Sequence, residues 1–134
     1  MLDHLIVDGY NVLYAWARRP GTPPIPVARQ TLLRDLELAA ATRGIRCTVV
    51  FDGQPIEDIT HASSAHLEVL FAGPRQSADT VIERLVCRSQ KQGAVPGAQT
   101  IVATDDRVLG NLIVGWGAHG WSTAMLARWL DEKC

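Results

Sequence analysis

The stretch HLIVD, residues 4–8, is a short apolar run that ends on an acid and is followed by glycine. A run of this length, bounded by a turn signal, is typical of a buried β-strand. Similar runs recur at residues 45–51, 67–71, 100–104 and 118–121, and we expect each of them to form a strand. The five runs together therefore predict a β-sheet, and the run at residues 4–8 is its first strand in the sequence.

Stretches with helical periodicity separate these expected strands. Between Leu32 and Ala40 the apolar residues share one helix face, and this helix begins near Pro26 and stops at Gly44. Further helices are expected from Ser77 to Gly93, from Asp105 to Val114, and after Ser122. Alternating strands and helices favour right-handed crossovers and a parallel sheet covered on both faces. We predict an α/β fold, a three-layer α/β/α sandwich with a five-stranded, mainly parallel sheet.

Composition agrees with one globular domain over residues 1–134. Hydrophobic residues make up 47% and charged residues 20% of the chain. Thirteen basic and fourteen acidic residues give a net charge of −1, which excludes a strongly basic coat protein but leaves room for a local basic patch. The three cysteines form no paired motif, and no leader or membrane-spanning run is recognised. We expect a cytoplasmic protein that does not bind membranes.

Acidic residues gather where the expected strands end. Asp8 ends the first strand, Asp52 follows the second, and Asp105 and Asp106 follow the fourth, while Asp79 lies in the first turn of the helix after the third. The carboxyl ends of parallel strands share one edge, where sites form. Because clustered like charges are unfavourable without a cation, the pattern predicts a Mg²⁺ or Mn²⁺ site suited to phosphoryl chemistry.

Each of these acids also has an ordinary structural explanation. Asp8-Gly9 and Asp52-Gly53 are common turn dipeptides. Asp79 can complement a helix dipole, and Asp105 or Asp106 can cap a helix. The chain has no phosphate-binding glycine loop, no dinucleotide motif and no nucleophile elbow. The choice therefore lies between a carboxylate site and separate structural roles.

Four motifs in chain order resemble those of a single family. They are LIVDGYNV at residues 5–12, VVFDG at 49–53, SADTVIERLV at 77–86 and VATDDR at 102–107. In this order and spacing they are similar to the motifs of the YacP-like NYN domains, PIN-fold proteins regarded as metal-dependent endoribonucleases. The stretch GWGA at 115–118 also matches a family segment. The resemblance covers nearly the whole chain and implies a PIN-like fold and an RNA substrate.

The resemblance implies a set of metal ligands when carried over residue by residue. Asp8 matches the central acid on the first strand, Asp79 the acid that opens a helix, and Asp106 the acid after the fourth strand. These three would hold one or two Mg²⁺ or Mn²⁺ ions, with Asp105 adding charge directly or through water. The expected reaction is in-line attack of a metal-bound water on an RNA phosphodiester.

Supporting residues follow from the same comparison. Asn11 matches an asparagine of the family in the turn after the first strand, and Asn11 and Thr104 would position ligands by hydrogen bonding. Asp52 matches the Phe-Asp motif and would either bind metal or brace the loop of Arg18 and Arg19.

The chain departs from the family pattern at three places. Asp105 stands where the family usually has serine, and Leu109 stands where it usually has glutamate. The last helix begins Ser122-Thr-Ala-Met125 rather than Ser-Ala-Arg-Glu. These departures leave open an alternative, a catalytically silent adaptor that binds RNA or associates with the ribosome.

Basic and aromatic residues near the acidic edge extend the hypothesis. The residues expected to contact phosphates are Arg18, Arg19, Arg75 and Arg107. Pairing of these arginines with Asp52 or Glu57 is the structural alternative. Tyr10 and Tyr14 suit either base stacking or core packing.

Two other classes of protein also carry acids at the edge of a parallel sheet. A phosphotransfer receiver needs a phosphoacceptor Asp ending its third strand and a Lys after its fifth, and neither is evident. A D-x-D phosphohydrolase is disfavoured because Tyr10 stands where its second acid belongs. A homodimer stays open, with an interface or the core as alternative places for Trp116, Trp121 and Trp129.

Overall fold

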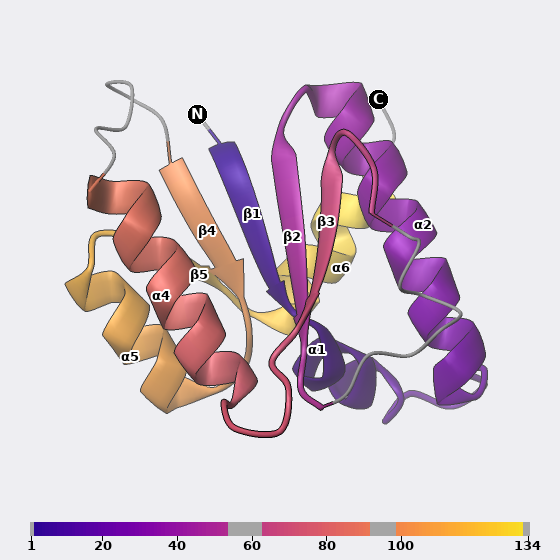
Figure 1. Cartoon of the computed structure of the whole chain (residues 1–134). Helices are drawn as coiled ribbons and strands as arrows, with labels where there is room; N and C mark the ends of the chain where they lie inside the picture. The colour runs from indigo at the N-terminus through magenta and orange to yellow at the C-terminus, as the bar shows by residue number, and fades with distance from the viewer. Residues whose placement is uncertain (1, 54–62, 92–98, 133–134) are drawn as a thin grey trace.

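A single parallel sheet forms the middle of the molecule. The computed structural model describes residues 2–53, 63–91 and 99–132. Its sheet has five strands in the order β3-β2-β1-β4-β5, and every neighbouring pair is parallel (Figure 1). The strands are β1 (Leu2–Asp8), β2 (Arg46–Phe51), β3 (Leu67–Phe71), β4 (Gln99–Ala103) and β5 (His119–Trp121).

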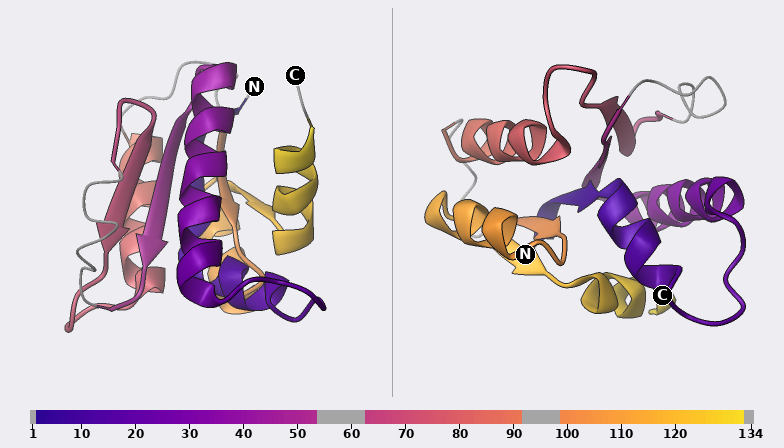
Figure 2. Two further views of the ribbon diagram at one scale, coloured as in Figure 1. Left: turned by 90° about the vertical axis from the view of Figure 1, so that its right-hand side faces the viewer. Right: turned by 90° about the horizontal axis from the view of Figure 1, so that it is seen from below.

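Helices cover both faces of this sheet. The helices are α1 (Gly9–Trp16), α2 (Ile25–Arg43), α4 (Ala78–Lys91), α5 (Arg107–Gly115) and α6 (Thr123–Asp131). One face carries α1, α2 and α6, and the other carries α4 and α5 (Figure 2). The predicted three-layer sandwich is confirmed, and its sheet is wholly parallel over the described residues.

Residue alternation along the central strand explains the two layers. In β1, Leu5 and Val7 pack with the core under α1, α2 and α6, whereas Ile6 packs with Ile82 and Ile113 under α4 and α5. The three β1 residues have no exposed surface. Strands buried on both faces read as continuous apolar runs, which is why the short N-terminal run predicts the fold.

Helix α1 is the element that the sequence pattern does not predict. It begins at Gly9, directly after β1, where an Asp-Gly pair suggested a turn. Glycine is required there for space, because a Cβ at residue 9 would lie 2.5 Å from Cε1 of Phe51. The chain therefore turns into a helix with no intervening loop, and Asn11 is helical rather than part of a turn.

Several predicted helix ends are confirmed. The helix α2 stops at Gly44, whose φ of +66° is a left-handed conformation that glycine adopts readily. Ser77 Oγ accepts a hydrogen bond from the N–H of Thr80 before α4, and Ser122 Oγ accepts one from Met125 at the start of α6. Gly93, expected to close α4, lies outside the described residues.

The tryptophans divide between core and surface. Trp121 and Trp129 pack against each other with ring centroids 5.7 Å apart and join the α2/α6 core, whereas Trp116 is 40% exposed. The core alternative is therefore confirmed for two of the three tryptophans considered for an interface. Among the described helices, none has the length and apolar character needed to cross a membrane.

Candidate active site

The predicted acids surround the carboxyl ends of β1, β2 and β4. Asp8 is the last residue of β1, and Asp52 follows β2 directly. Asp106 precedes α5, and Asp79 lies in the first turn of α4. Figure 1 shows the strands pointing to the edge where α1 begins and where the chain enters α4. The fold thus brings acids that are far apart in sequence to one edge.

Asp8 lies at the centre of this group. It is only 7% exposed, and burial is the main reason why its pKa rises to about 6. The neighbouring carboxylates of Asp79, Asp106 and Asp52 raise the pKa further. A hydrogen bond of 2.9 Å from Thr104 Oγ1 to Asp8 Oδ2 acts in the opposite direction. Negative charge on Asp8 is therefore unfavourable until a cation or proton offsets it.

Asp79 and Asp106 form a close carboxyl pair. Partial burial raises the pKa of Asp79, and the charges of Asp106 and Asp52 raise it further. The interaction with the Asp106 carboxyl also favours the protonated form of Asp79. A bound proton or cation offsets repulsion between neighbouring carboxylates.

A small polar network holds Asp8 and the start of α5 in place. Asn11 Oδ1 accepts a hydrogen bond from the N–H of Asp105 at 2.8 Å and lies 3.4 Å from Thr104 Oγ1, whose one proton is donated to Asp8. Thr104 Oγ1 itself accepts from the N–H of Asp106 at 3.1 Å. Because the amide oxygen of Asn11 faces this loop, its NH₂ group remains as a donor at the acidic edge.

Asp105 is turned away from the other acids. Its Oδ1 accepts from the N–H of Thr123 at 2.9 Å, and its Oδ2 accepts from Thr123 Oγ1 at 2.7 Å. Asp105 is also absent from the charges that raise the pKa of Asp8. The structure therefore brings Asp8, Asp79 and Asp106 together and directs Asp105 to the first turn of α6.

Asp106 and Asp52 each use one carboxylate oxygen in a structural bond. Asp106 is the N-cap of α5, with Oδ1 accepting from the N–H groups of Val108 and Leu109. Asp52 Oδ1 accepts from the N–H of Ala78 at 3.2 Å, which ties the end of β2 to α4. Each residue keeps a second oxygen for another partner.

Leu109 occupies the third position of α5 and faces the core. It has no exposed surface and packs in the cluster beneath α4 and α5. Leu109 therefore contributes to the core of this layer rather than to the group around Asp8.

The four predicted phosphate-contacting arginines are all exposed. Arg18 and Arg19 follow α1, Arg75 precedes α4, and Arg107 is the first residue of α5. Across residues 2–53, 63–91 and 99–132 the ion pairs are Arg43 with Glu132 and Arg46 with Asp3, so none involves these four. Glu57, one of their suggested partners, lies outside the described residues.

A groove adjoins the acidic group. It has a volume of about 350 Å³ and runs between the start of α5 and the β5–α6 connection. Its lining includes Thr104, Asp106, Arg107, Asn111 and Ser122. Arg107 is the basic side chain of this lining, beside Asp105 and Asp106.

The acids at this edge fit a divalent ion that water and substrate also ligate. In the part of the chain that the structure describes, no three His, Cys, Asp or Glu side chains are near enough to form a ready-made metal site. Mg²⁺, however, is commonly held by one or two carboxylates together with water and substrate phosphates. Asp79 and Asp106, beside the buried Asp8, supply hard oxygen donors of this kind.

Two partners in this region have no sequence signal. The contact between Asp105 and Thr123 joins residues on different elements, and Thr123 simply follows a helix cap in the sequence. Arg29 donates from Nη1 to Tyr10 Oη at 3.2 Å, which connects α2 with α1. Both contacts depend on how the helices are placed, which no local pattern encodes.

The sheet topology and these side chains define a class of protein: a doubly covered parallel α/β domain with an acidic site at the carboxyl edge. The family model of the YacP-like NYN domain matches residues 5–133. The protein YacP of Bacillus subtilis (strain 168) is 31% identical over 130 residues, covering 95% of this chain and 74% of YacP.

Solved structures give the same assignment. The crystal structure of Rae1 (YacP) from Bacillus subtilis matches with a TM-score of 0.75 at 30% identity, over 96% of this chain and 74% of that chain. Its W164L mutant matches with a TM-score of 0.70 at 30% identity, over 96% and 75%. The chain belongs to the YacP-like NYN domain family.

Proposed function

We propose that this protein is an endoribonuclease that hydrolyses RNA phosphodiester bonds with the help of Mg²⁺ or Mn²⁺. The observation that carries the proposal is the convergence of Asp8, Asp79 and Asp106 at one edge, where burial and mutual repulsion raise the pKa of Asp8 and of Asp79. Perturbed carboxyls clustered in this way are common at functional sites. Membership of a nuclease-like family supports the same conclusion.

Asp8, Asp79 and Asp106 would hold the divalent ion. When bound, such an ion neutralises charge on the phosphate and activates water for attack. In its absence, Asp8 and Asp79 retain protons at higher pH than usual, because the pKa of Asp8 is raised to about 6 and that of Asp79 is also raised. Metal binding should therefore release protons near neutral pH.

The surrounding residues orient these acids and the substrate. Thr104 donates to Asp8 and so fixes one carboxylate oxygen. Asn11, anchored through its oxygen to the N–H of Asp105, directs its NH₂ group toward an incoming phosphate. Asp105 acts here as a positioning residue, because it fastens the β4–α5 loop to α6.

RNA would reach this edge over a basic surface. Arg107 lines the groove beside Asp106, while Arg18, Arg19 and Arg75 are exposed and would contact flanking phosphates. A cluster of carboxylates repels RNA, so these arginines would supply the attraction and bound metal would strengthen it. We further propose that the protein works in the cytoplasm.

Incubation of end-labelled, structured RNA with the protein tests the function. Discrete cleavage products are expected in Mg²⁺ or Mn²⁺ and none in EDTA. The Asp8→Asn variant should leave the RNA intact, whereas Asp35→Asn, at an exposed acid on α2, should cut at the wild-type rate. RNA binding without cleavage in any divalent metal would instead favour the silent adaptor.

A further inference from the structure

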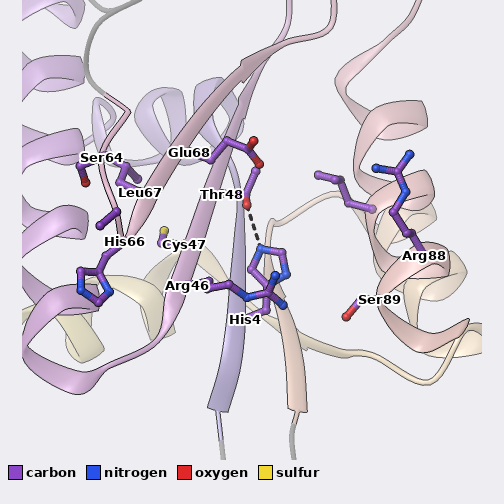
Figure 3. Close-up of a pocket in the computed structure, with 12 residues that line it drawn as sticks. His4, Arg46, Cys47, Thr48, Ser64, His66, Leu67, Glu68, Arg88 and Ser89 are labelled. Carbon is purple, nitrogen blue, oxygen red and sulfur yellow. Dashed lines mark hydrogen bonds between the residues drawn. The ribbon is translucent and has the colours of Figure 1, made fainter. Parts of the chain in front are cut away.

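A second polar cavity lies at the opposite end of the sheet. It has a volume of about 390 Å³ and lies between the beginnings of β1, β2 and β3 and the last turns of α4 (Figure 3). His4 and Asp8 belong to the same strand, and four residues of strand span about 13 Å. The cavity is therefore separate from the acidic edge. Its polar lining is His4, Arg46, Thr48, Ser64, His66, Glu68, Arg88 and Ser89.

The side chains of His4 and Thr48 have two polar hydrogens between them, and the hydrogen bond that joins these side chains needs only one. His4 Nε2 and Thr48 Oγ1 are 2.8 Å apart, and both residues are buried. His4 Nδ1 is buried and has no hydrogen-bond partner among the described residues. A neutral imidazole and a hydroxyl together hold two protons, and one of them forms the bond between them. Either tautomer thus leaves one donor without an acceptor beside the cavity.

The imidazole of His4 is neutral at physiological pH. Burial is the main reason why its pKa falls to about 4, and the charge of Arg46 lowers the pKa further, while Asp3 opposes the effect. Buried polar groups in proteins are nearly always hydrogen-bonded, and an unmatched one is unfavourable. An acceptor from a ligand would satisfy this pair.

Positive charge borders the same donor. Figure 3 shows Arg46 beside the His4 ring and Arg88 on α4 across the cavity. Arg46 is 3.6 Å from Asp3, but both side chains are more than half exposed, so this pair is weak. Arg88 has no ion pair among the described residues. Guanidinium groups match the oxygens of a phosphate.

We propose that this cavity binds a phosphate monoester of nucleotide size. Two guanidinium groups, the His4–Thr48 pair and nearby serine hydroxyls offer more donors than the two oxygens of a carboxylate accept, whereas a phosphate has three terminal oxygens. Glu68, the acid in the lining, accepts from hydroxyl or amino groups on the rest of the ligand. The volume lies within the range of small-molecule sites.

Calorimetric titration with adenosine 5′-monophosphate tests this proposal. The wild-type protein should bind the nucleotide more tightly than inorganic phosphate, and Arg88→Gln should weaken binding about tenfold, the effect of losing one charge-assisted hydrogen bond. Arg84→Gln, at an exposed arginine one turn earlier on α4, is the matched control and should bind as the wild type does. No nucleotide binding at millimolar concentration, or equal binding by Arg88→Gln and the wild type, would overturn the proposal.

A second readout reports on His4 without altering it. In ¹⁵N NMR spectra, an imidazole resonance of His4 should shift when the nucleotide is added, because either Nδ1 or the Thr48 hydroxyl bonded to Nε2 gains a hydrogen-bond partner. An unchanged resonance at saturation contradicts the assigned site. Oligonucleotides with a 5′-phosphate or a 5′-hydroxyl identify the source of the phosphate. If the phosphorylated oligonucleotide binds more tightly than the nucleotide, the ligand is an RNA end. If the nucleotide binds more tightly, the ligand is a free nucleotide.

Discussion

Asp8 links the stability of the fold to its proposed chemistry. Its pKa is raised from 3.8 to about 6, mainly by burial, so the folded protein binds a proton there that the unfolded chain has already lost. Between pH 3.8 and about pH 6 the unfolding free energy therefore falls as pH rises, and above about pH 6 this contribution to the unfolding free energy is fully lost. A charged Asp8 thus weakens the metal-free protein at neutral pH.

Replacement of Asp8 by asparagine should therefore stabilise the metal-free protein at pH 7.5. The expected gain is on the order of 1–3 kcal/mol, since one pKa unit corresponds to about 1.4 kcal/mol. Urea unfolding in EDTA at pH 4.5 and pH 7.5 measures it, and the gain should shrink at the lower pH. A variant less stable than the wild type at pH 7.5 would contradict the assigned electrostatics.

At Asp105 the structure favours a positioning role over direct metal binding. Asp105→Ser removes both hydrogen bonds to Thr123 and should lower the unfolding free energy by about 1–2 kcal/mol. The cleavage rate below the melting temperature should stay within a few-fold of wild type. A loss of activity by orders of magnitude with an unchanged melting temperature would return Asp105 to the ligand set. Adding Leu109→Glu should not raise the cleavage rate, because Leu109 is fully buried.

At the scale of elements, the strands and helix caps were predictable because their signals are local. The run at residues 67–71 coincides with β3. Helix α2 ends at Gly44, because the left-handed backbone conformation of this glycine stops the helix. Helix α1 was missed because an Asp-Gly pair signals a turn, whereas Gly9 actually serves the close approach of Phe51. The convergence of the acids followed from topology, but the orientation of Asp105 depends on where α6 packs.

Helix α1 presents an aromatic side chain beside the acidic edge. Tyr10 and Tyr14 stack with centroids 5.9 Å apart and an interplanar angle of 28°, and Tyr14 is 58% exposed. The Tyr10 ring packs against the Phe51 ring, and the Tyr10 hydroxyl accepts a hydrogen bond from Arg29. The outer ring is thus held firmly while its other face is open, which suits stacking on an unpaired base.

Tyr14→Ala should weaken single-stranded RNA binding by about tenfold, because stacking on one aromatic side chain contributes roughly 1–3 kcal/mol. Tyr14→Phe should bind as the wild type does. Fluorescence anisotropy with labelled RNA in EDTA measures affinity without cleavage. Leu38→Ala, at an exposed apolar residue of α2, is the matched control. Equal affinities for Tyr14→Ala and Leu38→Ala would exclude a stacking role.

For the whole molecule, the acidic edge exists only in the folded state, because its members come from β1, α4 and the β4–α5 connection. A cation that binds there must stabilise the fold. Millimolar Mn²⁺ should raise the melting temperature of the wild type, and Asp8→Asn should lose most of this increase. An identical melting curve with and without Mn²⁺ would argue strongly against a metal site.

The most direct test of the account is the rate of RNA cleavage by Asp79→Asn in saturating Mn²⁺. Asp79 lies in the first turn of α4, where an acid stabilises a helix by only about 0.3–1 kcal/mol. Removing its charge also relieves repulsion from Asp106, so the metal-free melting temperature should be unchanged or higher. The account predicts a cleavage rate lower by orders of magnitude in a fully folded variant. A folded Asp79→Asn protein that cuts RNA at the wild-type rate would contradict it.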